Sequence, residues 1–366
     1  MRAQRSPVSP VSPASCDFLA GNTRLRARWP DLLSTTDHDL VGRDLAGLAS
    51  ALSRTAYRPH LDAAAARIGA WAGLRTQLEA AIGGRLAAVL SAVRGVYGGG
   101  AGDVVAVLLS RWDVQDLRTL LRGVVRAVPA EQVLPLVHGV GALTLAAARE
   151  IAEAPDVPTA LERLAAAGLP ARESGPVLLE AAGHYELHRD LTDLDHSVSA
   201  AAALAWQHTL HCAGRAGRPV ADLVGAEVDA ANLVGALRLR VAAEQGQISL
   251  TPVLVGRHLL PGGSHDHSVW ARVAAGARPD QFLPAPWRPL LDRWERSGDL
   301  PALAGDLQAA VHRTALTGWR TDPLGAGVPV AYVLTAEREA RTLRLLVHTA
   351  GLGRPTEQVD PPHQPA

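Results

Sequence analysis

Two short sequence strings recur three times, in the same order, along the 366 residues. The clearer string consists of an acidic residue, a polar residue three positions later, and then a leucine followed by further apolar and basic residues. Its copies begin at Asp113, Asp229 and Glu339, at spacings of 116 and 110 residues. A fainter string precedes each copy, and the leucines of the two strings lie 39, 39 and 36 residues apart. Because copies in fixed order indicate an internal duplication, the sequence predicts three modules of similar size.

The predicted fold class is all-α. Ala, Leu, Arg and Glu are abundant, apolar residues recur at three- and four-residue steps, and strand signals are weak. Clusters of glycine and proline, such as those at 214–219 and 284–289, mark the ends of helices. We expect a disordered lead at 1–16, a disordered tail at 355–366, and helical modules at 17–130, 131–246 and 247–354.

The repeat strings supply the residues that we expect to be structural in each module. They are Asp113, Leu117 and Arg122 in the first copy, Asp229, Asn232 and Arg238 in the second, and Glu339, Leu343 and Arg344 in the third.

Within each module, the acid of the fainter string varies together with the base of the clearer one. Glu79 accompanies Arg122, Asp195 accompanies Arg238, and an uncharged glutamine accompanies a histidine in the third module. Carboxylates and guanidinium groups form directed hydrogen bonds. The pattern therefore predicts the ion pairs Glu79–Arg122 and Asp195–Arg238, with solvated faces that never meet as the open alternative.

The charge composition excludes several function classes. The 36 basic residues balance 36 acidic ones, so no nucleic-acid polyanion is indicated as a partner. All the basic residues are arginines, because the sequence contains no lysine. A phosphate-loop lysine, a Schiff-base lysine and a lysine general base are therefore impossible.

The cysteines and the apolar segments bear on the compartment. Cys16 and Cys212 form no closely spaced pair, which favours a reducing cytoplasm. The first residues lack the apolar region of a signal peptide. No apolar window approaches the ~18 to 20 residues that a membrane span needs, so we expect no direct membrane span.

Five segments carry a resemblance to a known family. They are LLSRWDVQDLRTLLRG (108–123), EVDAANLVGALRLR (227–240), LLPGG (259–263), VAYVLTAEREARTLRLLV (330–347) and FLAGNTRLRARWPDLL (18–33). In order and spacing they resemble the C subunit of the prokaryotic V/A-type rotary ATPases, the relative of the d subunit of the vacuolar proton pump. The resemblance covers roughly residues 17–353.

This resemblance implies a funnel of three helical domains related by pseudo-threefold symmetry. It also implies a non-catalytic subunit without cofactors that couples the stalk subunits D and F to the proteolipid rotor ring for ATP-linked proton or sodium transport. Such a subunit is cytoplasmic and peripheral, held at the inner face of the plasma membrane through the ring. The missing lysines, Trp112 and Trp206 depart from the family pattern and leave the surface electrostatics open.

Two other readings compete with this one. A helical-repeat scaffold of unrelated function would share the repeats but not the Asn22–Arg26 element. A histidine-dependent metalloenzyme would use His184 and His188, which share a helix face, or the His-rich loop at 262–267. The order H-Y-E-L-H does not match a metalloprotease helix, and we expect no native metal site.

Two further patterns lead to structural expectations. The segment YGGGAGD (97–103) lacks dinucleotide-binding spacing and indicates a loop between helices. Four arginines at helical spacing, Arg111, Arg118, Arg122 and Arg126, form a basic stripe. The stripe either binds an acidic partner or, the favoured alternative, is solvated or paired within the chain. No nucleophile elbow is present.

Overall fold

The computed structural model describes residues 17–33, 40–68, 73–170, 174–279 and 282–351. In these ranges every regular element is helical, which confirms the all-α class. The predicted lead at 1–16 and tail at 355–366 lie outside the described residues. No helix of the described ranges is both long and apolar enough to cross a membrane.

One order of elements occurs three times along the chain: short helices, then two long ones. First come α1 (Leu19–Arg28), α2 (Leu45–Leu52) and α3 (Arg58–Ile68), then the long α4 (Leu74–Arg94) and α5 (Gly99–Val125). Next come α6 (Ala130–Val133), α7 (Leu145–Ala152), α8 (Val157–Ala166) and α9 (Gly175–His188), then α10 (Leu191–Ala213) and α11 (Arg218–Glu244). Last come α12 (Pro252–Arg257), α13 (His267–Ala274) and α14 (Arg288–Ser297), then α15 (Leu300–Thr321) and α16 (Gly327–Gly351).

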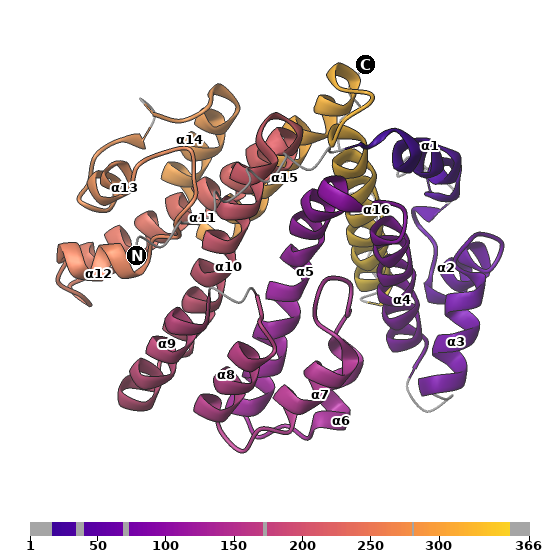
Figure 1. Ribbon diagram of the computed structural model, residues 1–366, viewed down its shortest axis with the longest axis horizontal. Helices are drawn as coiled ribbons and strands as arrows, with labels where there is room; N and C mark the ends of the chain where they lie inside the picture. Colours follow the sequence, from indigo (N-terminus) through magenta and orange to yellow (C-terminus); the bar gives the residue numbers. More distant parts are fainter. Residues whose placement is uncertain (1–16, 34–39, 69–72, 171–173, 280–281, 352–366) are drawn as a thin grey trace, which may run out of the picture.

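The long helices lie between three separate groups of short helices (Figure 1). The helix with the fainter string packs against the helix that carries the clearer string in another module: α10 against α5, α15 against α11, and α4 against α16. The short helices also pack on the helix that carries the clearer string of another series: α7 and α8 on α5, α13 on α11, and α1 and α2 on α16. Each of the three series of helices therefore packs against the second long helix of another series.

Capping residues and prolines fix where several helices begin. Asp190 accepts hydrogen bonds from the amides of Thr192 and Asp193 at the start of α10, and Asp299 does so from Ala302 at the start of α15. Such caps satisfy amides that have no partner within the helix. The predicted breaks at 214–219 and 284–289 are confirmed, since α11 and α14 begin there with proline in the first turn.

The YGGGAGD segment is only partly the loop that its sequence predicts. The turn ends at Gly98 and α5 begins at Gly99, so the last glycines form the first turn of the helix and not a loop. A glycine costs a helix about 1 kcal/mol relative to alanine. Here Ala101, Val104 and Val105 are almost fully buried, and their burial offsets that cost.

Among the residues that the structure describes, the buried apolar side chains form two cores. The smaller one combines the second half of α5 with α6–α9 and the first half of α10, around Leu117, Leu161, Leu178 and Leu194. The larger one holds the remaining long helices and the outer groups α1–α3 and α12–α14. Helix α5 thus passes from one core into the other and joins them. The module limits at 130/131 and 246/247 stay a prediction.

Candidate functional site

The acidic residue that opens the first repeat string anchors a loop of the following module. Asp113 on α5 is 1 % exposed and accepts hydrogen bonds from the amides of Ala142 (2.7 Å) and Leu143 (3.2 Å). Burial raises the pKa of Asp113, and these two hydrogen bonds oppose the shift. A Cβ atom at Gly141 would collide with the carboxylate, so glycine allows this close approach.

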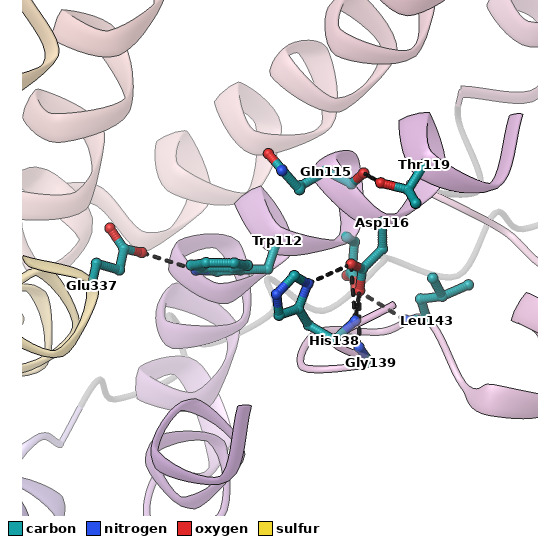
Figure 2. Close-up of polar contacts among 9 residues, drawn as sticks. Trp112, Gln115, Asp116, Thr119, His138, Gly139, Leu143 and Glu337 are labelled. Carbon is teal, nitrogen blue, oxygen red and sulfur yellow. Dashed lines mark hydrogen bonds and ion pairs between the residues drawn. The ribbon is translucent and has the colours of Figure 1, made fainter. Parts of the chain in front are cut away.

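The polar residue one helical turn later completes the same anchor. Asp116 accepts hydrogen bonds from the amides of His138 (3.0 Å) and Gly139 (2.9 Å), and its carboxylate lies 2.9 Å from Nδ1 of His138. Figure 2 shows Asp116 directed at this loop, while Trp112 on the same helix points away toward Glu337. Together the two aspartates hold residues 138–143 onto α5.

The second copy of the string repeats this arrangement on α11. Asp229 accepts hydrogen bonds from the amides of Ser264 (2.9 Å) and His265 (3.4 Å), again beside a glycine, Gly263, whose Cβ would collide with it. Asn232 accepts from the Leu260 amide (2.7 Å) and donates to the Leu260 carbonyl (2.9 Å). The loop that leads into α13 is therefore fixed to α11.

The third copy binds the beginning of the chain. Glu339 on α16 accepts hydrogen bonds from the Leu33 amide (2.9 Å) and the Tyr57 hydroxyl (2.6 Å). Burial raises the pKa of Glu339, and the hydrogen bonds from Tyr57 and Leu33 oppose the shift. Asn22 donates to the Gly325 carbonyl (3.1 Å) at the other end of this contact. The last long helix and the first module are thus joined without a chain connection.

The remaining repeat residues fall into two groups. Leu117 and Leu343 are buried in the cores. Arg344 is partly buried, and burial lowers its pKa although the nearby charge of Glu79 acts the other way. Arg238 is exposed.

The ion pairs expected within modules are wrong in their choice of partner. Arg122 pairs with Asp195 instead of Glu79, and Glu79 pairs with Arg75 one turn earlier on α4, at 3.1 Å. The expected pair of Asp195 with Arg238 is not formed among the described residues, because Asp195 pairs with Arg122. The physical reason is that α10 packs on α5, so the acid of the second module meets the base of the first.

Three positions that the sequence analysis did not connect converge between the long helices. Arg111, Glu227 and Glu337 each lie two residues before the acid of a repeat string, on α5, α11 and α16. One guanidinium nitrogen of Arg111, Nη2, lies 2.8 Å from Glu227 and 3.5 Å from Glu337. His312 of α15 contacts Glu227 at 3.2 Å, and Trp112 donates to Glu337 at 2.9 Å. We call these five residues the hub.

The hub is a mostly buried ionic cluster. The side chains of Arg111, Glu227 and Glu337 are 11 %, 21 % and 7 % exposed. Burial acts to lower the pKa of Arg111, but the two carboxylates outweigh it and raise that pKa. Burial acts to raise the pKa of Glu227, but the charge of Arg111 and the contact with His312 outweigh it and lower that pKa. The cluster contains no Ser, Thr, Cys or Lys side chain, and one guanidinium group in it contacts carboxylates from two other long helices, α11 and α16.

The three repeat strings contain a sequence pattern from which the hub could have been predicted. An alignment of the three strings places Arg111, Glu227 and Glu337 in one column, and opposite charges in one column are compatible with a shared centre. Arg111 instead appeared as part of a basic stripe. The favoured interpretation of this stripe, a face that is paired within the chain, is confirmed for three of its arginines. Arg111 pairs with Glu227, Arg118 donates to Ser199, and Arg122 pairs with Asp195.

Several histidines make contacts within the chain. His265 lies 3.1 Å from Asp229 and 2.7 Å from the Phe282 carbonyl, and the ring centres of His184 and His188 lie 4.3 Å apart with the rings tilted by 42°. In the part of the chain that the structure describes, no three His, Cys, Asp or Glu side chains are placed to hold a metal ion.

One histidine gives the chain a predicted pH dependence. His196 on α10 lies near His258, with ring centres 6.3 Å apart, and burial followed by the charge of His258 lowers its pKa to about 4. The unfolded chain, with an ordinary histidine pKa of about 6.5, binds more protons between these values. The contribution of neutral, buried His196 to the free energy of unfolding is therefore fully present above pH 6.5 and is lost as the pH falls toward 4.

We therefore expect the free energy of unfolding to fall by about 1–2 kcal/mol through His196 between pH 7 and pH 5. Urea unfolding of the wild type and of His196→Gln at both pH values measures this. The variant should lose that part of the pH dependence. An identical pH dependence in both proteins would contradict the assignment to His196.

Comparison with known proteins places the chain in a family. The sequence profile of the family described as "ATP synthase (C/AC39) subunit" matches residues 21–360. The V-type ATP synthase C subunits of two Thermus thermophilus strains are each 31 % identical over 351 residues. The match covers 94 % of this chain and 97 % of each relative. The chain therefore belongs to the ATP synthase (C/AC39) subunit family.

Proposed function

We propose that this chain is the non-catalytic central-stalk subunit of a V/A-type rotary ATPase. In this role it connects stalk subunits D and F to the proteolipid rotor ring, so that torque passes between ATP chemistry and proton or sodium transport. It sits on the cytoplasmic face of the membrane and is held there by the ring. The observation that carries the proposal is the similarity to the Thermus C subunit along 94 % of the chain.

The internal architecture fits a part that transmits force. Each module is fixed to the long helix of another by buried carboxylates, and the third copy ties α16 to the start of the chain through Glu339. A closed series of such contacts resists the separation of any one module. The absence of lysine also removes the phosphate-loop chemistry of ATP hydrolysis.

Binding to the stalk tests the proposal directly. The purified chain is mixed with a purified D–F complex at about 10 µM each and analysed by size-exclusion chromatography with light scattering. A contact of at least ~1,200 Å² in total should give a stable complex with one copy of each subunit. Arg293→Met, which changes one exposed ion pair, serves as a control that should still bind, because broad contacts tolerate single rim substitutions.

Separate elution of the chain and the D–F complex would contradict the proposed partner. ATP hydrolysis by the isolated chain would contradict the non-catalytic role.

A further inference from the structure

The hub has one arginine and two carboxylates that compete for it. Both carboxylates approach the same nitrogen of Arg111, Nη2, and they do so unequally: Glu227 at 2.8 Å and Glu337 at 3.5 Å. The longer distance lies beyond the usual range of an N–H···O hydrogen bond. Arg111 is therefore engaged mainly with α11 and only loosely with α16.

Each carboxylate also has a second contact that does not depend on Arg111. Trp112 donates to Glu337 at 2.9 Å, and His312 lies 3.2 Å from Glu227. Whichever carboxylate loses the arginine thus keeps a hydrogen-bond partner. A buried carboxylate without any partner would make such an exchange too costly.

Arg111 has an unused donor for the exchange. Its second terminal nitrogen, Nη1, is buried and has no hydrogen-bond partner among the described residues. A guanidinium group binds a carboxylate best through two parallel hydrogen bonds. Nη1 is therefore available to donate to a carboxylate that moves within hydrogen-bond distance of it.

We propose that the hub is a two-position device, in which Arg111 pairs either with Glu227, as in this structure, or with Glu337. The two arrangements have the same charges, and in both each carboxylate keeps a donor. The exchange moves α11 and α16 relative to α5 by a shift of about 1–2 Å, typical of packed helices that change partners. The inference concerns the isolated chain and does not depend on the proposed partners.

Unfolding of three variants tests the competition. Glu227→Gln and Glu337→Gln each leave one carboxylate for Arg111, so each should change the equilibrium constant of unfolding by less than about tenfold. The double variant leaves Arg111 buried without a carboxylate. Its change in the equilibrium constant of unfolding should exceed the product of the two single-variant changes by at least about tenfold.

In a control pair of variants, Glu244→Gln replaces Glu227→Gln. Glu244 lies on the same helix and pairs with Arg240, and its side chain is 61 % exposed. Combined with Glu337→Gln, Glu244→Gln should give multiplicative effects, because distant sites act independently. Multiplicative effects for the hub pair as well would overturn the proposal. That result would show that Arg111 depends on one carboxylate alone or on neither.

Distances between spin labels test the two arrangements themselves. Gln115, Ala231 and Arg341 are exposed and occupy one column of the repeat, on α5, α11 and α16. Labels are attached in pairs to cysteines at these positions after Cys16 and Cys212 are replaced by serine.

Relative to Glu337→Gln, the Glu227→Gln variant should shorten the α5–α16 distance and lengthen the α5–α11 distance by about 1–2 Å. The wild type should contain both populations. Identical distance distributions in the three proteins would overturn the proposal even if all of them fold normally.

Discussion

Arg111→Met is expected to lower the free energy of unfolding by about 3–5 kcal/mol, because it leaves two carboxylates in a buried site without their cation. Methionine retains most of the volume of the arginine stem, so the change removes charge more than packing. Glu227 and Glu337 would then be held only by His312 and Trp112. Guanidinium chloride unfolding, followed by circular dichroism, measures the loss.

Arg293→Met is the matched control for this prediction. Arg293 also forms a short ion pair, at 2.7 Å to Asp306, but its side chain is 62 % exposed. Exposed pairs contribute at most about 1 kcal/mol. If the two variants lost similar stability, the hub would not be the buried ionic centre described above.

Asp113→Ala is expected to lower the free energy of unfolding by about 2–4 kcal/mol. The substitution removes the acceptor from the amides of Ala142 and Leu143, and a buried donor without a partner costs about 1–3 kcal/mol. Hydrogen exchange gives a local readout, because the loop at 138–143 should exchange faster while α5 itself stays protected.

The control for this substitution is Asp103→Ala on the same helix. Asp103 is exposed, so its replacement should change stability by no more than about 0.5 kcal/mol. An Asp113→Ala protein that unfolds like this control, with no faster exchange at 138–143, would show that the carboxylate does not anchor the loop.

Much of the fold follows from the periodicity of the sequence. The strings starting at Asp113, Asp229 and Glu339 predict three long helices, and α5, α11 and α16 contain them. Apolar periodicity records which face of a helix is buried, so leucines such as Leu117 are placed correctly in the core. The start of α5 was less predictable, because the low helix propensity of its glycines is outweighed by tertiary burial.

The ion pairs show a limit that tandem repeats impose. Equivalent residues recur in every module, so a pattern that joins Asp195 to an arginine does not tell whether that arginine is Arg238 of its own module or Arg122 of the preceding one. The packing of α10 on α5 decides for Arg122. Sequence spacing contains no information about this choice.

The hub was missed for a different reason. Arg111, Glu227 and Glu337 are 116 and 110 residues apart, and each stands in a helix whose neighbours alone suggest an ordinary charged face. Their opposite charges become meaningful only when the three strings are superposed. The buried anchors at Asp113 and Asp229 were predicted as structural residues, but the loops that they bind could not be found from helical periodicity.

The proposed coupling of stalk rotation to the membrane ring by this chain is tested most directly by a paired measurement on membrane vesicles. The ATP hydrolysis rate and ion transport are measured with the complete complex and with a complex that lacks only this chain. Without the chain, we expect ion transport to be lost while the catalytic head continues to hydrolyse ATP. Unchanged transport without the chain, or loss of hydrolysis by the isolated head, would contradict it.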